Sequence, residues 1–229
     1  AGHRRSATCL ALAVDLRRTT ATTIHRKAPM IRRGLLLPVA LALAGCSVFP
    51  DRPHVPVRRF DLNPQRPQRR AAPRGAGVLL LRHLRGVPGL QELGLRRARA
   101  DGGFDIAPYD EWLAPPADLA ERALRNWLQA SGLFAAVVAP GSRADHTLVL
   151  EAQLTRLETL PARNEARAGI AGVLLLERGA STRVLTTFDV EGRAPLPTGA
   201  DAPAEAAAME AALADAFAAV EQAFLAGLR

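Results

Sequence analysis

The amino-acid sequence predicts an α+β fold, in which two main helices cover one face of an antiparallel or mixed β-sheet. Short segments with the alternation or the apolar runs of β-strands lie before and between two longer segments with helical periodicity. Gly and Pro, of which the 229 residues contain 18 and 17, separate these segments. Runs of strands with a small number of separated helices are typical of α+β domains.

The predicted strands share either a continuous apolar run or an alternation of apolar and polar residues. In chain order they are residues 59–62, 78–81, 93–99, 103–106, 146–157, 167–177 and 181–191. The first is expected to pair with the edge of the domain. Gly102-Gly103 and Arg178-Gly179-Ala180 predict the turns of two hairpins.

Two segments have the apolar stripe of a helix. Pro115-Pro116 is expected to begin the first helix, over residues 117–131, and Gly132 to end it. The second predicted helix covers residues 203–227, where large apolar residues recur at every third or fourth position. These residues are Met209, Leu213, Phe217, Val220, Phe224 and Leu228.

The net charge of +8 does not indicate a nucleic-acid partner. Residues 1–45 carry eight basic side chains and one acidic side chain, so the other 184 residues have 22 basic and 21 acidic groups. The domain itself is therefore nearly neutral, and we expect no binding of nucleic acid. Residues 47–99 are locally basic, as either a solvated linker or a segment close to anionic lipid headgroups.

Residues 30–45 have the layout of a secretory signal peptide, which begins at Met30 with Arg32 and Arg33. The nine apolar residues that follow are about half of the ~20 residues that a membrane-spanning helix needs. The sequence Leu-Ala-Gly-Cys at the end resembles a bacterial lipobox, which implies cleavage between Gly45 and Cys46 and lipid attachment to the Cys46 thiol.

The anchor predicts where the protein lies. Two or more acyl chains hold a protein stably on a bilayer, and Ser47, rather than Asp, after Cys46 points to the outer membrane in a sorting signal of the enteric type. We therefore expect a lipid-anchored protein on the periplasmic face of the outer membrane of a Gram-negative bacterium. Residues 1–29, which lie before Met30, are expected to be upstream translation that is not native to the protein.

A tether is expected to follow the signal. Residues 46–76 are rich in Pro and Arg, and such chains favour an extended form that rises ~3.1 Å per residue. At that rise, residues 47–57 alone would reach about 34 Å from the membrane. Residues 77–229 are then expected to form a single α+β periplasmic domain.

No motif in the sequence indicates catalysis. After residue 46 the histidines are His54, His83 and His146, and neither His-Glu-x-x-His nor Cys-x-x-Cys occurs. Asp110-Glu111 would serve as an acid–base pair only if both were buried together. We therefore expect a protein that is not an enzyme and that holds no cofactor and no metal.

One aromatic cluster remains, in residues 108–116. It contains Tyr109, which is the only Tyr, and Trp112, which is one of two Trp residues. Either these rings anchor the first helix to the sheet, or they form a contact surface, because aromatic residues are enriched at interfaces. Three nearby arginines are further candidates for partner contact: Arg96, Arg97 and Arg99.

Residues 46–228 resemble the ABC-type transport auxiliary lipoprotein family, which includes the lipoprotein of the paraquat-inducible (Pqi) system. The most specific resemblance is the segment Pro-Tyr-Asp-Glu-Trp-Leu-Ala-Pro-Pro at 108–116. The lipobox, Phe60-Asp61-Leu62, the apolar strand 78–81 and Ser-Gly-Leu-Phe at 131–134 match in order. His146 departs from the family pattern, which has an aromatic residue there.

This resemblance implies a non-enzymatic accessory component of a transport system that includes ABC-transporter and MCE-domain proteins. Such systems move phospholipid or another hydrophobic substrate between membranes, and members of the family self-associate in some cases, so a homo-oligomer is a further expectation. Two alternatives stay open. The protein could be a periplasmic shuttle that holds lipid in its own cavity, or a structural lipoprotein that assembles other envelope components.

Overall fold

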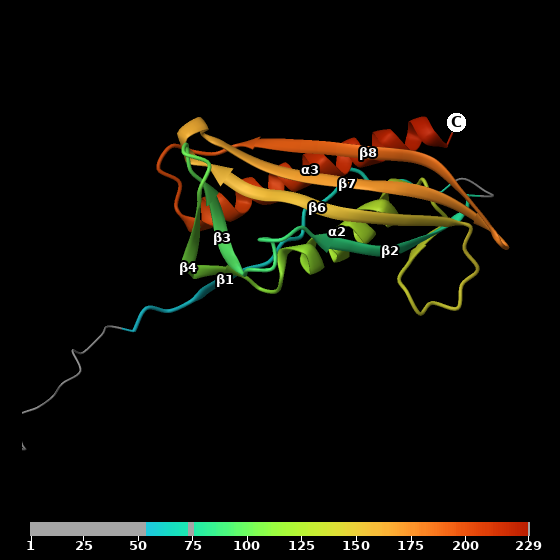
Figure 1. The fold of residues 1–229 in the computed structure, drawn as a ribbon, viewed down its shortest axis with the longest axis horizontal. Coiled ribbons are helices and arrows are strands. Elements are labelled where there is room, and N and C mark those ends of the chain that lie inside the picture. The colour runs from blue at the N-terminus through green and yellow to red at the C-terminus, as the bar shows by residue number, and fades with distance from the viewer. Residues whose placement is uncertain (1–53, 73–75, 229) are drawn as a thin grey trace, which may run out of the picture. The chain divides into compact units, whose positions relative to one another are not determined.

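The long strand β6 is the centre of the sheet. β6 (Leu148–Leu160) pairs antiparallel with β7 (Glu165–Arg178) over its whole length, and β7 pairs antiparallel with β8 (Ser181–Pro195). The computed structural model describes residues 54–72 and 76–228, and Figure 1 shows these three strands side by side. A 3-10 turn, η1 (Pro161–Arg163), joins β6 to β7.

The other edge of β6 carries two separate groups of strands. β2 (Val78–Gly86) pairs parallel with the first half of β6, and β5 (Ala136–Val138) pairs parallel with β2. At the far end of β6 lies β3 (Gly94–Ala98), which pairs antiparallel with β4 (Phe104–Trp112). β1 (Arg58–Phe60) pairs parallel with β4, so the eight described strands form the predicted mixed sheet.

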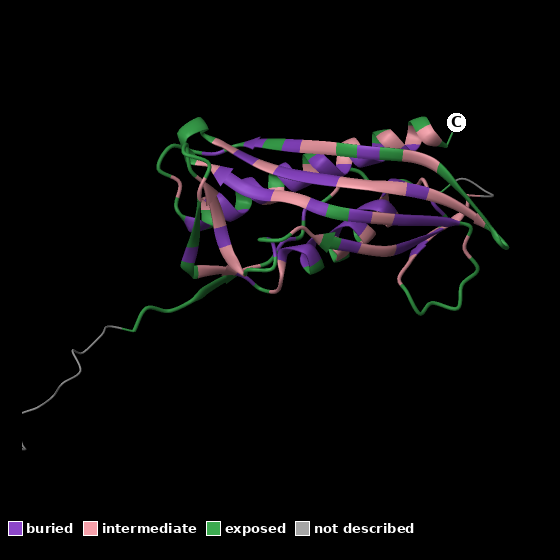
Figure 2. Cartoon of the chain, in the orientation of Figure 1, coloured by how far each residue is buried: buried purple, intermediate pink, exposed green. Residues whose placement is uncertain are grey.

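Two helices, α2 (Pro116–Ser131) and α3 (Ala202–Gly227), cover one face of this sheet, as predicted (Figure 1). α2 contacts β2 and β5, whereas α3 lies along β7 and β8. Gly132, with φ of 75°, ends α2, because the left-handed conformation at this position favours Gly. Along the strands, buried residues are interspersed with more exposed ones (Figure 2), as expected for a sheet with helices over one face.

The backbone of α3 approaches β8 very closely at Gly192. A Cβ atom on Gly192 would overlap the backbone of Ala212 and Ala216, so only Gly fits at this position. The alanines of α3 that face the sheet, such as Ala208, are buried as well. Five of the six large residues of the predicted stripe are fully buried, and Leu228 is 40% exposed.

The domain begins earlier than residue 77, which corrects the predicted boundary. β1 pairs with β4, as expected for the edge strand predicted at 59–62, and the following Leu62 is fully buried in the core. Residues 54–228 belong to one compact unit, apart from the undescribed 73–75. The prediction of a tether over 46–76 is therefore wrong for residues 58–70, because β1 pairs with β4, Leu62 and Pro64 are buried, and the N–H of Arg70 donates to Ala130.

The strand predicted at 103–106 is also longer than expected, because β4 continues to Trp112. The register of β4 with β3 shifts between Gly94 and Arg96. Pro108, which has no N–H to donate, lies in the part of β4 opposite this irregularity. A strand thus passes through the aromatic cluster, and this decides where its side chains point.

We expect Gly192→Ala to lower the free energy of unfolding by about 3 kcal/mol. The added methyl group would overlap the backbone of α3, and backbone atoms cannot move aside as a flexible side chain can. Urea unfolding measures the change. Gly77→Ala is the matched control, since its new methyl would lie 3.3 Å from the side chain of Leu148, which can turn aside. An equal loss of stability in both variants would contradict the close approach of α3.

Candidate functional site

Exposed large apolar side chains occur on β4 and just before β1, at one end of the sheet. We call this group the β1–β4 patch. Its members, each 45–47% exposed, are Val55, Val57 and Tyr109, and Phe104 and Ile106 are exposed on β4 as well, at 44% and 37%. Since Arg58 pairs with Asp110, the parallel register brings Val57 beside Tyr109. The patch thus combines residues that are about fifty positions apart in the sequence.

Trp112 does not belong to this patch, although it was predicted to contact a partner. Its side chain is only 2% exposed, and its backbone N–H donates to the carbonyl oxygen of Leu93 at 2.7 Å. Tyr109 and Trp112 are three residues apart in a strand, so they point to opposite faces. The contact prediction is wrong for Trp112, which is buried in the core, whereas Tyr109 is 47% exposed and does not form a buried anchor with it.

Two of the three predicted arginines pair with buried carboxylates. The Arg97 Nε donates to both carboxylate oxygens of Glu205, at 2.7 and 2.8 Å, and Glu205 is 3% exposed. The Arg96 guanidinium lies 3.4 Å from the ring centroid of Phe104 and 3.4 Å from Glu158. Their positive charges are therefore largely compensated within the chain.

Arg99 is more exposed, but it too has acidic neighbours. It forms ion pairs with Asp101 at 3.2 Å and with Asp105 at 3.0 Å. The three arginines thus do not form a free basic surface. The predicted cleavage and attachment residues, Gly45 and Cys46, lie outside the described residues.

A second site lies on the helix side of the domain, where residues 62–70 cross the helices in an extended form. We call this segment the strap. Leu62 and Pro64 are buried and the Arg66 side chain is 9% exposed, whereas the residues between them are exposed. Over residues 62–66, every second side chain thus points into the domain, as in a strand.

Hydrogen bonds hold the strap at both ends. The N–H of Asn63 donates to Glu210 of α3 at 3.1 Å, and the N–H of Arg70 donates to the carbonyl of Ala130 of α2 at 2.9 Å. Since its two ends bind different helices, the strap fixes α2 relative to α3.

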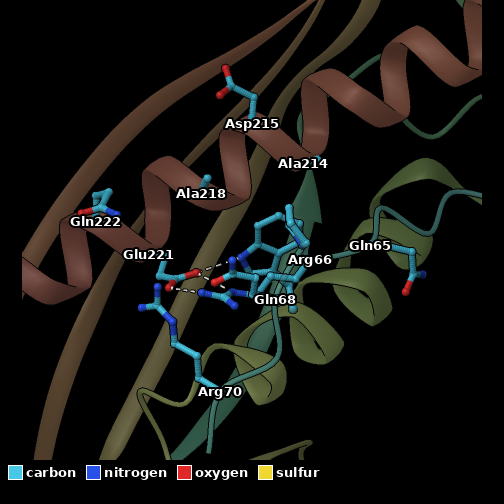
Figure 3. A pocket seen from close by; sticks show the side chains of 11 residues that line it. Gln65, Arg66, Gln68, Arg70, Ala214, Asp215, Ala218, Glu221 and Gln222 are labelled. Atoms are coloured by element: carbon cyan, nitrogen blue, oxygen red, sulfur yellow. Dashed lines mark hydrogen bonds and ion pairs between the residues drawn. The ribbon is translucent and has the colours of Figure 1, made fainter.

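A buried charged cluster lies between these ends (Figure 3). The Nε and Nη2 atoms of Arg66 donate to the two carboxylate oxygens of Glu221, at 3.0 and 2.8 Å. The indole N–H of Trp127 donates to the same carboxylate at 3.2 Å. The bond from Arg66 to Glu221 raises the pKa of the guanidinium, so Arg66 stays charged.

Two hollows flank the strap, and Arg66, Gln65 and Trp127 line both of them. The first, of about 460 Å³, is bounded on its other side by α3, and Figure 3 shows its lining. The second, of about 440 Å³, is bounded by α2. We call the first the α3 hollow.

Sequence reasoning missed Arg66 and Glu221, because they are 155 positions apart. One signal was present. Glu221 lies four residues after Phe217 and three before Phe224, so it shares the buried stripe of α3. A carboxylate at such a position needs a partner, and the alternation of the strap supplies one.

No cluster of three or more potential metal ligands occurs within residues 54–72 and 76–228. No helix in these residues has the length and apolar character of a membrane span.

Comparison with known proteins supports the fold. No family model and no curated protein matches the chain. Protein XCC0632 from Xanthomonas campestris, described with the family model DUF330, has a similar structure, with a TM-score of 0.64 and 19% identity over 75% of this chain and 96% of that chain. An uncharacterized protein has a TM-score of 0.50 and 14% identity, over 73% of this chain and 98% of that chain.

A third solved structure, a dodecamer of a PelC variant from Paraburkholderia phytofirmans, has a TM-score of only 0.34 and 14% identity, over 65% of this chain and 94% of that chain. This likeness is too low to carry an argument. At these levels of identity, the first two structures show that this chain shares their α+β fold.

We expect Arg66→Ala to lower the free energy of unfolding by about 3 kcal/mol, because it leaves the Glu221 carboxylate buried without its cation. Arg122→Ala is the matched control. The Arg122–Asp61 pair also joins the chain near the strap to α2, but its side chains are 44% and 47% exposed, so its loss should cost less than about 1 kcal/mol. Equal losses in urea unfolding would show that the Arg66 pair is not buried in solution.

Two carboxylates of the sheet, those of Glu158 and Glu165, should make contributions to the free energy of unfolding that change in opposite directions with pH. Burial raises the pKa of Glu158 despite the nearby Arg156 and Arg96, so the stability that it contributes is present below pH 4.5 and is lost as the pH rises. The bond from Arg167 lowers the pKa of Glu165, so its contribution is present above pH 4.5 and is lost as the pH falls.

Urea unfolding between about pH 3 and pH 7 tests this difference. The stability of Glu158→Gln relative to the wild type should increase as the pH rises, whereas that of Glu165→Gln should decrease. The same direction in both variants would contradict the burial of Glu158.

Proposed function

We propose that this protein is a non-enzymatic outer-membrane lipoprotein, anchored by Cys46 with its domain in the periplasm. In this proposal it is an accessory component of an ABC/MCE-type transport system that moves phospholipid or another hydrophobic substrate across the envelope. The β1–β4 patch docks a transporter component, and the MCE-domain protein is the partner that the sequence resemblance favours.

The β1–β4 patch is the observation that supports docking most directly. Large apolar side chains that gather on one surface of a folded domain are typical of interaction sites, and an aromatic residue such as Tyr109 is favoured there. The neighbouring Leu113 is 57% exposed and extends the apolar surface. Val55 lies only nine positions after Cys46, so the patch is near the anchor in the sequence.

The ion pairs of β4 support a role other than catalysis. Asp110 and Glu111 were considered as an acid–base pair, but Asp110 bonds to Arg58 at 2.6 Å and Glu111 lies 3.5 Å from Arg59. Consecutive strand residues point to opposite faces, so the two carboxylates do not share a site.

Photocrosslinking in cells tests the proposal. With a photoreactive residue at Tyr109 or Leu113 of the full lipoprotein, we expect a crosslink to an MCE-domain protein. The matched control is Val184, which is 55% exposed but lies on β8 rather than on β1 or β4. It should give no such crosslink. In Cys46→Ser, which lacks the acceptor thiol, the crosslink should be lost with the membrane attachment.

Other outcomes separate the alternatives. Crosslinks only between copies of the chain would mean that the patch forms a homo-oligomer. Crosslinks to other envelope proteins would favour the structural lipoprotein. Correct anchoring with no crosslink at either position would contradict docking through this patch and favour the lipid shuttle.

A further inference from the structure

We propose that the α3 hollow binds an oxyanion carried on a short apolar body, such as the phosphate or carboxylate end of a single-chain amphiphile. This inference does not depend on docking through the β1–β4 patch, because the hollow lies between the strap, Trp127 and α3.

Arg66 supplies the first observation. Its side chain is nine-tenths buried, and two of its three nitrogen atoms are used by Glu221. The third, Nη1, is buried and has no hydrogen-bond partner among the described residues. A buried N–H without an acceptor is costly, and an oxyanion is the acceptor that suits a guanidinium best.

Arg70 supplies the positive charge. Glu221 offsets the charge of Arg66, whereas Arg70 lines the same hollow and forms no ion pair within the described parts of the chain. Asp215 also lines the hollow, but its carboxylate accepts the backbone N–H of Arg193 at 3.0 Å and points away from Arg66 (Figure 3). Gln68 and Arg70 are exposed, so both side chains can adjust when a ligand binds beside Arg66.

The opposite wall of the hollow is apolar. It is formed by Ala214 and Ala218 of α3, with Pro67 and the ring of Trp127. These small alanines leave about 460 Å³, toward the lower end of the range of small-molecule sites. The hollow therefore suits one short alkyl chain whose charged end lies beside the two arginines.

Calorimetric titration of residues 47–229 tests this proposal with three probes: octyl phosphate, inorganic phosphate and octanol. We expect octyl phosphate to bind at least about tenfold more tightly than either of the others, because only it has both the anion and the apolar chain. If inorganic phosphate binds as tightly as octyl phosphate, the hollow does not recognise an apolar chain. If octanol binds as tightly, the hollow does not recognise an oxyanion. Either result would overturn the proposal.

Variants locate the site. Ala218→Leu fills the hollow and should weaken octyl phosphate binding at least about tenfold, whereas Ala211→Leu, at an exposed position of the same helix, should not. Arg70→Gln should weaken binding similarly, with Arg178→Gln on the exposed β7–β8 turn as its control. Equal binding by Ala218→Leu and the wild type would overturn the proposal, as would the absence of binding.

Discussion

The close approach of α3 to β8 at Gly192 is the constraint on which the rest of the structure depends. Because Gly192 and the facing alanines have almost no side chain, the helix lies directly on the sheet. The large residues of α3 pack around this contact, and the ring of Phe224 lies 5.6 Å from that of Phe188 of β8. The ring of Phe217 meets that of Trp127 of α2 at 5.7 Å, and Phe224 meets Phe134 at 6.1 Å. The close contact of α3 with β8 thus fixes how the aromatic residues of α3 pack against Trp127 and Phe134.

The charged residues of this protein follow from the same arrangement. Because α3 is buried over a wide face, a carboxylate on that face needs a cation nearby, and Glu205 and Glu221 both lie there. Each meets an arginine from a distant part of the chain, Arg97 of β3 or Arg66 of the strap. The buried carboxylates of α3 therefore favour the arrangement in which β3 and the strap, which carry these arginines, lie against the helix.

Periodicity predicted much of the fold, and composition misled the prediction where it disagreed with periodicity. The apolar stripe of α3 and the alternation of β6 to β8 dictated elements that the structure contains. The strap has a period of two, in Leu62, Pro64 and Arg66, but its Pro and Arg content indicated a tether. Trp112 was misassigned because its strand was expected to end at residue 106.

The candidate site was harder to predict than the fold, because its residues meet only in three dimensions. The exposed Tyr109 was found from its aromatic type, but the neighbouring Val57 needed the register of β1 with β4. Likewise, no local pattern joins Arg66 to Glu221, since pairing of distant charges follows from the packing of the helices rather than from spacing along the chain.

The strap also imposes an order on folding. Two of its partners, Glu210 and Glu221, belong to the last element of the chain, so the strap completes its native contacts only after nearly all residues are available. Contacts between such distant positions form late, because closing long loops is entropically costly. The strap thus remains without these two partners, and open to solvent, until α3 has been made.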